Sequence, residues 1–211
     1  KMRMQENTFD IGWQECAKRV FGSGRHVSAK GLHNTQFAPA NLKHALAGNN
    51  PVSKIWNKSY DEEYDGLDSL DVFTEITTEQ YHAYVVKYGE RARFIPTMNL
   101  FSIKPDMDGN PNRAKSRIVA LGNLERRVWS REDKYAPVLS STAARLLVSM
   151  AVEDGCRLKQ ADCKNAFCNG ILPEDEICIV KPPAGCPRSK KGTFWKLNKT
   201  LYGLCRSAHH W

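Results

Sequence analysis

The chain has 211 residues, of which 41% are hydrophobic and 26% charged, a composition typical of a globular protein with one or two domains. Its most apolar stretch, residues 143–152, is far shorter than the roughly 20 residues of a membrane-spanning helix and contains Arg145, which excludes a membrane-spanning protein. The formal net charge of +8 favours a polyanionic partner such as nucleic acid. The first residues lack a secretory signal and do not begin with Met, so we expect a segment of a longer protein.

The cysteines follow neither a disulfide framework nor a zinc site. Their number is odd, most lie in the second half, and none forms a Cys-x-x-Cys pair. This usage favours reduced thiols in an intracellular protein. The cysteines are Cys16, Cys156, Cys163, Cys168, Cys178, Cys186 and Cys205.

Charge divides the chain into three parts. Residues 1–60 carry a net charge of +6, residues 61–79 carry −8, and residues 80–211 carry +10. The acidic segment marks a candidate domain boundary. It is interpreted either as a surface for a basic partner or, more simply, as the solvated face of a helix.

Helical patterns dominate the first half. Residues 41–47 predict a short helix, and residues 56–67 predict an amphipathic one. Residues 77–88 predict a third, because apolar residues recur at helical spacing between a candidate N-cap at Thr77 and a terminating Gly89.

A hairpin is predicted next. Residues 95–104 and 113–121 read as strands joined by the turn-rich segment 105–112. Three cations capable of holding a phosphate group then fall on one face, because side chains alternate along a strand. The alternative is a solvated edge strand whose charges prevent aggregation. These cations are Arg113, Lys115 and Arg117.

The second half predicts strands and helices in irregular order. A helix is predicted over residues 141–153, followed by a strand over 156–162 that would place Asp162 at its carboxyl end. Residues 176–180 and 193–197 predict two further strands. The predicted fold class is therefore α+β.

The order of short motifs in this part is specific. The block Gln-Ala-Asp162-Cys-Lys-Asn-Ala-Phe-Cys-Asn-Gly170 follows Tyr135-Ala-Pro-Val138 and precedes Leu201-Tyr-Gly-Leu204. Upstream, Lys115-Ser-Arg117-Ile-Val-Ala120 matches a strand that typically reads Lys-Ala-Arg-Leu-Val-Ala. Together these blocks resemble the reverse transcriptase of copia-type LTR retrotransposons.

The resemblance runs over residues 56–211 and implies a partial right-hand polymerase. Its fingers would span about 56–134, with the hairpin at their centre, and the first part of its palm about 135–211. Residues 1–55 would be a poorly defined linker or N-terminal extension of the polyprotein.

The resemblance also implies site residues. Asp162 would be the first catalytic carboxylate and would bind Mg²⁺, with the backbone carbonyl of Cys163 as a further ligand. Two such ions serve the complete enzyme, and Mn²⁺ is a possible substitute. Lys115 and Arg117, with Arg113 as a third member, would contact the triphosphate of the incoming nucleotide.

Three further positions follow from the same motifs. Phe167 would lie under the incoming sugar and exclude a 2′-hydroxyl, although it is also interpretable as a core aromatic. Tyr202 and Gly203 would lie near the nascent base pair and the template. After Leu204 the chain continues Cys-Arg-Ser-Ala-His-His-Trp, whereas the family commonly has Lys-Gln-Ala-Pro-Arg-Ala-Trp, so template positioning departs from the family pattern there.

The predicted function is an RNA-directed DNA polymerase segment that is incomplete by itself. The family's second acidic motif contains an Asp-Asp pair, and no such pair occurs in this chain, so we expect no polymerisation by it alone. The alternatives are a non-catalytic basic nucleic-acid-binding module, a decayed retrotransposon remnant, or an interaction domain.

Partners and location follow from the resemblance only. They are an RNA template, a tRNA-like or DNA primer, deoxynucleoside triphosphates, and the integrase and ribonuclease H regions of the same polyprotein, with no membrane. The implied location is a cytoplasmic particle, with later entry of the DNA product into the nucleus.

Overall fold

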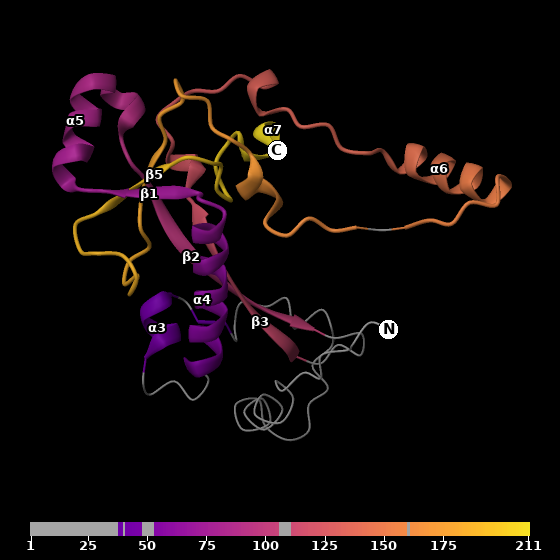
Figure 1. Cartoon of the computed structure of the whole chain (residues 1–211), viewed down its shortest axis with the longest axis horizontal. Helices are drawn as coiled ribbons and strands as arrows, with labels where there is room; N and C mark the ends of the chain where they lie inside the picture. The colour runs from indigo at the N-terminus through magenta and orange to yellow at the C-terminus, as the bar shows by residue number, and fades with distance from the viewer. Residues whose placement is uncertain (1–37, 40, 48–52, 106–110, 160) are drawn as a thin grey trace.

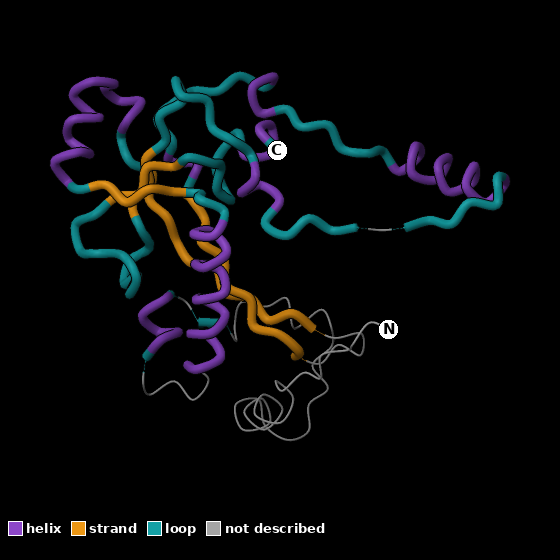
Figure 2. The backbone as a smooth tube through the Cα atoms, viewed as in Figure 1, coloured by secondary structure: helices purple, strands orange, loops and turns teal. Residues whose placement is uncertain are grey.

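A computed structural model describes residues 38–39, 41–47, 53–105, 111–159 and 161–211. Five strands form one mixed sheet in the order β1-β5-β4-β2-β3, in which only the β2–β4 pair is parallel among the described strands. The chain is thus mixed α and β, as its sequence predicts (Figures 1 and 2). The strands are β1 (Phe73–Ile76), β2 (Ile95–Pro105), β3 (Pro111–Ala120), β4 (Ile179–Lys181) and β5 (Phe194–Leu197).

Helix α4 (Ser53–Ser69) forms the core with this sheet (Figure 1). Its buried stripe includes Trp56, Tyr60 and Tyr64, spaced by four residues so that their rings lie on one face. The ring of Trp56 meets that of Phe101 edge to face at 5.4 Å, and the ring of Tyr64 meets that of Trp195 at 5.9 Å. The predicted helix over residues 56–67 is confirmed and is slightly longer at both ends.

Two other helices begin at predicted caps. Helix α5 (Thr78–Tyr88) starts with a capping box between Thr77 and Gln80 and ends at Gly89, whose φ is 64°. The short helix α3 (Leu42–Leu46) is capped by Asn41. The predictions for residues 77–88 and 41–47 are therefore confirmed.

The predicted hairpin is formed by β2 and β3, and its loop, 106–110, lies outside the described residues. Even-numbered residues of β3 from Ala114 to Ala120 are buried, whereas odd-numbered residues are exposed or half-buried. β3 is an edge strand, as one of the two predicted interpretations has it, but α4 covers its outer edge. Ser116 N–H donates to Ser59 Oγ at 2.8 Å, and Ile118 N–H donates to Glu63 Oε1 at 3.3 Å.

Helix α6 (Ser141–Glu153) confirms the predicted helix over residues 141–153, with Ser140 as its N-cap. It lies at the end of a long excursion of the chain, away from the sheet (Figure 1). Its large apolar side chains are exposed, including Leu146, Leu147 and Met150. The predicted apolar stripe therefore has no packing partner among the described residues.

The prediction of a strand over residues 156–162 is wrong. Residues 156–159 and 161–163 form no strand, because they pair with no other strand of the described chain, and they are exposed. A strand needs a neighbour to satisfy its backbone groups, and no strand of the described part of the chain lies beside this segment. The strands predicted over 176–180 and 193–197 exist as the shorter β4 and β5.

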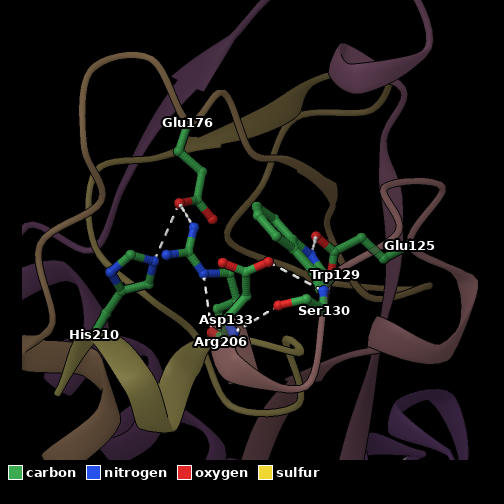
Figure 3. Close-up of polar contacts among 7 residues, drawn as sticks. All are labelled: Glu125, Trp129, Ser130, Asp133, Glu176, Arg206 and His210. Atoms are coloured by element: carbon green, nitrogen blue, oxygen red, sulfur yellow. Dashed lines mark hydrogen bonds and ion pairs between the residues drawn. The ribbon is translucent and has the colours of Figure 1, made fainter. Parts of the chain in front are cut away.

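A network of polar contacts connects residues 206–210 with Glu176 and with the segment 129–133 that follows the hairpin (Figure 3). Glu176 Oε2 accepts from Arg206 Nη1 at 2.6 Å and contacts His210 Nε2 at 3.1 Å. Arg206 Nε also donates to the carbonyl of Asp133 at 3.2 Å, and its guanidinium lies over the ring of Trp129. Four short helices belong to this region: η3 (Gly122–Leu124), η4 (Glu132–Lys134), η5 (Ala166–Asn169) and α7 (Ser207–His210).

The described helices also bear on the membrane question. None of them is long and apolar enough to cross a bilayer.

The six cysteines of the described residues are free thiols, of which Cys168 and Cys178 are buried.

Candidate functional site

A cleft of about 420 Å³ is lined by nearly all of the site residues that the sequence predicts. Its walls are α4, β3, the segment 162–167 and Tyr202. A larger cavity of about 840 Å³ lies between α5 and η3, but none of the predicted site residues lines it. The smaller cleft is therefore the better candidate. The predicted residues that line it are Arg113, Lys115, Arg117, Asp162, Cys163, Phe167 and Tyr202.

One wall of the cleft is cationic. Lys115 and Arg117 are half-buried, and Arg113 is exposed and forms an ion pair with Glu62 at 3.4 Å. Burial, together with repulsion from the neighbouring Arg117, lowers the pKa of Lys115. Because cations crowded in this way repel one another, an anion bound between them would be stabilised.

The segment 162–167 supplies the other wall. Asp162 and Cys163 are exposed, and the chain turns at Asn165, whose φ of 53° is left-handed, to enter η5. Lys164 also lines the cleft, a position that sequence reasoning missed although it lies inside the quoted motif.

Phe167 is half-buried at the cleft wall. Its ring meets that of Tyr202 at 5.7 Å and that of Trp211 at 6.1 Å, both edge to face. The position is compatible with each of the two predicted roles, because the ring both packs against aromatic neighbours and borders the cleft.

Tyr202 and Gly203 differ in their position relative to the cleft. Tyr202 lines the cleft, and burial raises the pKa of its hydroxyl to about 12. Gly203 does not line it. Its φ is +88°, and a Cβ there would lie 2.2 Å from the carbonyl oxygen of Ala120, so only glycine allows this loop to approach β3 so closely. Gly203 therefore positions Tyr202, whose carbonyl accepts from the N–H of Ala120 at 2.7 Å.

Helix α4 contributes cleft residues that the sequence did not indicate. Glu63 is 7% exposed, and burial raises the pKa of its carboxyl group. Glu63 is an exception within the acidic segment 61–79, whose other acidic side chains are exposed, as the interpretation of a solvated face predicts. A signal existed: Ser59 and Glu63 are polar residues spaced by four on the same stripe as the buried aromatics.

The cleft does not by itself assemble a metal centre. Within the described residues, no group of three or more His, Cys, Asp or Glu side chains is placed to hold an ion. Asp162 offers one exposed carboxylate, which can provide a single ligand.

The comparisons with known proteins agree with these motifs. A family model described as reverse transcriptase (RNA-dependent DNA polymerase) matches residues 80–211. The Retrovirus-related Pol polyprotein from transposon RE1 of Arabidopsis thaliana is 33% identical over 112 residues, or 53% of this chain and 8% of that polyprotein. That from transposon TNT 1-94 of Nicotiana tabacum is 28% identical over 173 residues, or 82% of this chain and 12% of that polyprotein.

The search of solved structures gave no match. The chain spans about a tenth of the length of the curated relatives it matches. The family match covers more than half of the chain and contains the motifs around Lys115, Asp162 and Tyr202. The chain therefore belongs to the reverse transcriptase (RNA-dependent DNA polymerase) family, and its resemblance to the copia-type retrotransposon enzymes is confirmed.

Proposed function

We propose that this chain serves RNA-directed DNA synthesis within a copia-type Pol polyprotein, and that its cleft binds the triphosphate of a deoxynucleoside triphosphate. The observation that carries the proposal is the juxtaposition of the cationic face of β3 and the Asp162 motif in one cleft of about 420 Å³. A triphosphate carries several negative charges, and charge-assisted hydrogen bonds to it contribute roughly 1.5–3 kcal/mol each.

The residue roles follow from position in the cleft and from the family motifs. Lys115 and Arg117 hold the triphosphate, and Arg113 assists when it leaves its ion pair with Glu62. Phe167 supports the sugar and excludes a 2′-hydroxyl. Asp162 is the first catalytic carboxylate.

The fold proposal is a right hand whose fingers span about 56–134 and whose palm begins at about 135. The hairpin β2–β3 would be the core of the fingers. Tyr202, held in place by Gly203, would border the nascent base pair and the template. Residues 1–55 would be a linker or N-terminal extension.

Reverse transcriptases generally use divalent metal ions. Two Mg²⁺ ions, or Mn²⁺, would serve the complete enzyme, with Asp162 and the Cys163 carbonyl as ligands. The described residues do not fit that requirement alone, because they lack a set of three suitable side chains. We therefore propose that this chain binds nucleotide and template and needs further carboxylates for chemistry.

The proposed partners are those of a Pol polyprotein. They are an RNA template, a tRNA-like or DNA primer, and the integrase and ribonuclease H regions of the same polyprotein. The proposed location is a cytoplasmic particle, followed by entry of the DNA product into the nucleus.

Nucleotide binding by the 211-residue chain tests the proposal. Calorimetric titration with dATP should give an affinity that falls about tenfold or more in Lys115→Ala and in Arg117→Ala, because each loses a charge-assisted hydrogen bond. Arg145→Ala, on the distant exposed helix α6, removes the same charge and should change the affinity less than about twofold. If the three substitutions lowered the affinity for dATP equally, the net charge of the chain, and not the cleft, would determine nucleotide binding.

A complete polymerase that carries this segment extends the same test to catalysis. Asp162→Asn should abolish primer extension and spare template binding. Retained extension would remove Asp162 from the catalytic role. The second candidate function, a non-catalytic nucleic-acid-binding module or decayed remnant, is favoured by the formal net charge of +8, and it predicts template binding without dATP binding.

A further inference from the structure

Glu63 is a buried carboxylate that lines the cleft, and the family motifs do not include it. It lies on α4, upstream of the matched residues 80–211. Its Oε1 accepts the N–H of Ile118 at 3.3 Å, on the outer edge of β3. It therefore contacts the strand whose neighbouring residues, Lys115 and Arg117, form the cationic wall.

The electrostatic surroundings of Glu63 are mixed. The cations that attract it are Lys115 and Arg117 on β3 and Lys164 in the segment 162–167. Cys168 and Tyr202 also lie within its electrostatic influence. At 7% exposure it is poorly screened by water, so its charge acts strongly on these cations.

We propose that Glu63 is a positioning residue that sets the polyphosphate affinity of the cleft. Its hydrogen bond holds β3 in place, and its charge is a fixed internal counter-anion to Lys115, Arg117 and Lys164. An arriving triphosphate must share these cations with Glu63, so the carboxylate weakens polyphosphate binding and favours release. This inference rests on the proposed nucleotide-binding function, and it makes α4 part of the functional unit.

The substitution Glu63→Gln separates charge from structure. A glutamine side chain keeps an oxygen that can accept from the Ile118 N–H but removes the negative charge. Calorimetric titration of the full chain with inorganic tripolyphosphate and with dATP should show binding about three- to tenfold tighter than for the unsubstituted chain, at an unchanged midpoint of thermal unfolding. The salt dependence of the affinity should become steeper, because more cationic charge is available to the ligand.

Asp61→Asn is the matched control. It makes the same change in net charge on the same helix, but Asp61 is exposed and does not line the cleft. Its effect on tripolyphosphate binding should stay below about twofold. If the Glu63→Gln variant does not fold, Glu63→Met is the second variant, because methionine is apolar and of similar volume. It also removes the negative charge, so it should likewise tighten tripolyphosphate binding.

The outcomes distinguish this inference from the proposed function. An unsubstituted chain that binds neither tripolyphosphate nor dATP overturns both. Binding by that chain that is unchanged or weaker in Glu63→Gln, at normal thermal stability, overturns only the role of Glu63 and leaves it a structural residue. Equal tightening in Asp61→Asn would assign the effect to net charge and likewise overturn the inference.

Discussion

Three carboxylates line the cleft, those of Glu62, Glu63 and Asp162, and the surroundings of the last two suit them to different tasks. Asp162 is exposed, just before the turn at residues 164–165, where it can exchange ligands with solvent. Glu63 is buried and accepts a backbone hydrogen bond from Ile118. Because burial raises the pKa of Glu63, charging this residue costs free energy that the hydrogen bond from the Ile118 N–H and the cationic neighbours offset in part. The exposed carboxylate fits a ligand role and the buried one a positioning role.

Gly203 is the residue whose replacement should be least tolerated in the cleft region. In Gly203→Ala the new Cβ would lie 2.2 Å from the Ala120 oxygen at a φ of +88°, so we expect a loss of at least about 2 kcal/mol in the free energy of unfolding. Gly185→Ala is the control, since Gly185 has a similar φ of +81° but nothing within 4 Å. Its cost should be about 1 kcal/mol. Urea denaturation measures both, and equal losses would mean that the close approach is unimportant.

At the scale of the element, the decisive feature is the protected edge of β3. An exposed edge strand is a site for aggregation, and its charges alone offer limited protection. Here α4 supplies Ser59 and Glu63, whose side chains accept from the N–H groups of Ser116 and Ile118. The carbonyl of Tyr202 accepts from the next N–H along the same edge, that of Ala120. These three hydrogen bonds therefore fix the position of β3 beside the cleft.

Ser59→Ala tests this edge. The substitution leaves the buried N–H of Ser116 without its acceptor and removes the donor to the Ala114 carbonyl, so unfolding should become easier by about 1–3 kcal/mol. Ser69→Ala, at the exposed end of the same helix, should cost less than about 0.5 kcal/mol. Chemical denaturation followed by circular dichroism compares the two. A small loss in Ser59→Ala would mean that water replaces the serine at the strand edge.

At the scale of the whole molecule, one ionic network joins segments far apart in the chain. The side chains of Glu176 and Arg206 are 10% and 18% exposed, and His210 contacts the same carboxylate oxygen (Figure 3). Arg206 also reaches Asp133 and Trp129, which follow the hairpin. The network therefore anchors the residues that directly follow the 201–205 loop, in which the Tyr202 carbonyl accepts from the N–H of Ala120 on β3.

Glu176→Gln should destabilise the whole fold. It leaves the guanidinium of Arg206 largely buried without its counter-charge, which costs about 2–4 kcal/mol and lowers the midpoint of thermal unfolding. Glu90→Gln removes an equally charged partner from Arg93 and Arg126, but both pairs are exposed and together should contribute less than about 1 kcal/mol. Differential scanning fluorimetry on both variants checks the contrast. Similar midpoints would mean that the network contributes little to stability.

Local signals in the sequence determined most of the elements. The cap at Thr77 and the stop at Gly89 define α5, and the period-two pattern of residues 113–120 defines the two faces of β3, because caps and alternation depend only on near neighbours in the chain. The motif around Asp162 likewise determined the family.

Only the tertiary structure decided the rest. That Glu63 turns into the cleft and that Gly203 touches Ala120 depend on contacts between distant segments, which no local pattern specifies. The predicted strand over residues 156–162 fails for the same reason, since a strand exists only beside a partner, and the described chain provides none there. The sequence by itself thus determined the motifs and the local elements, whereas packing decided which side chains share the cleft, because burial and hydrogen-bond satisfaction are properties of the whole fold.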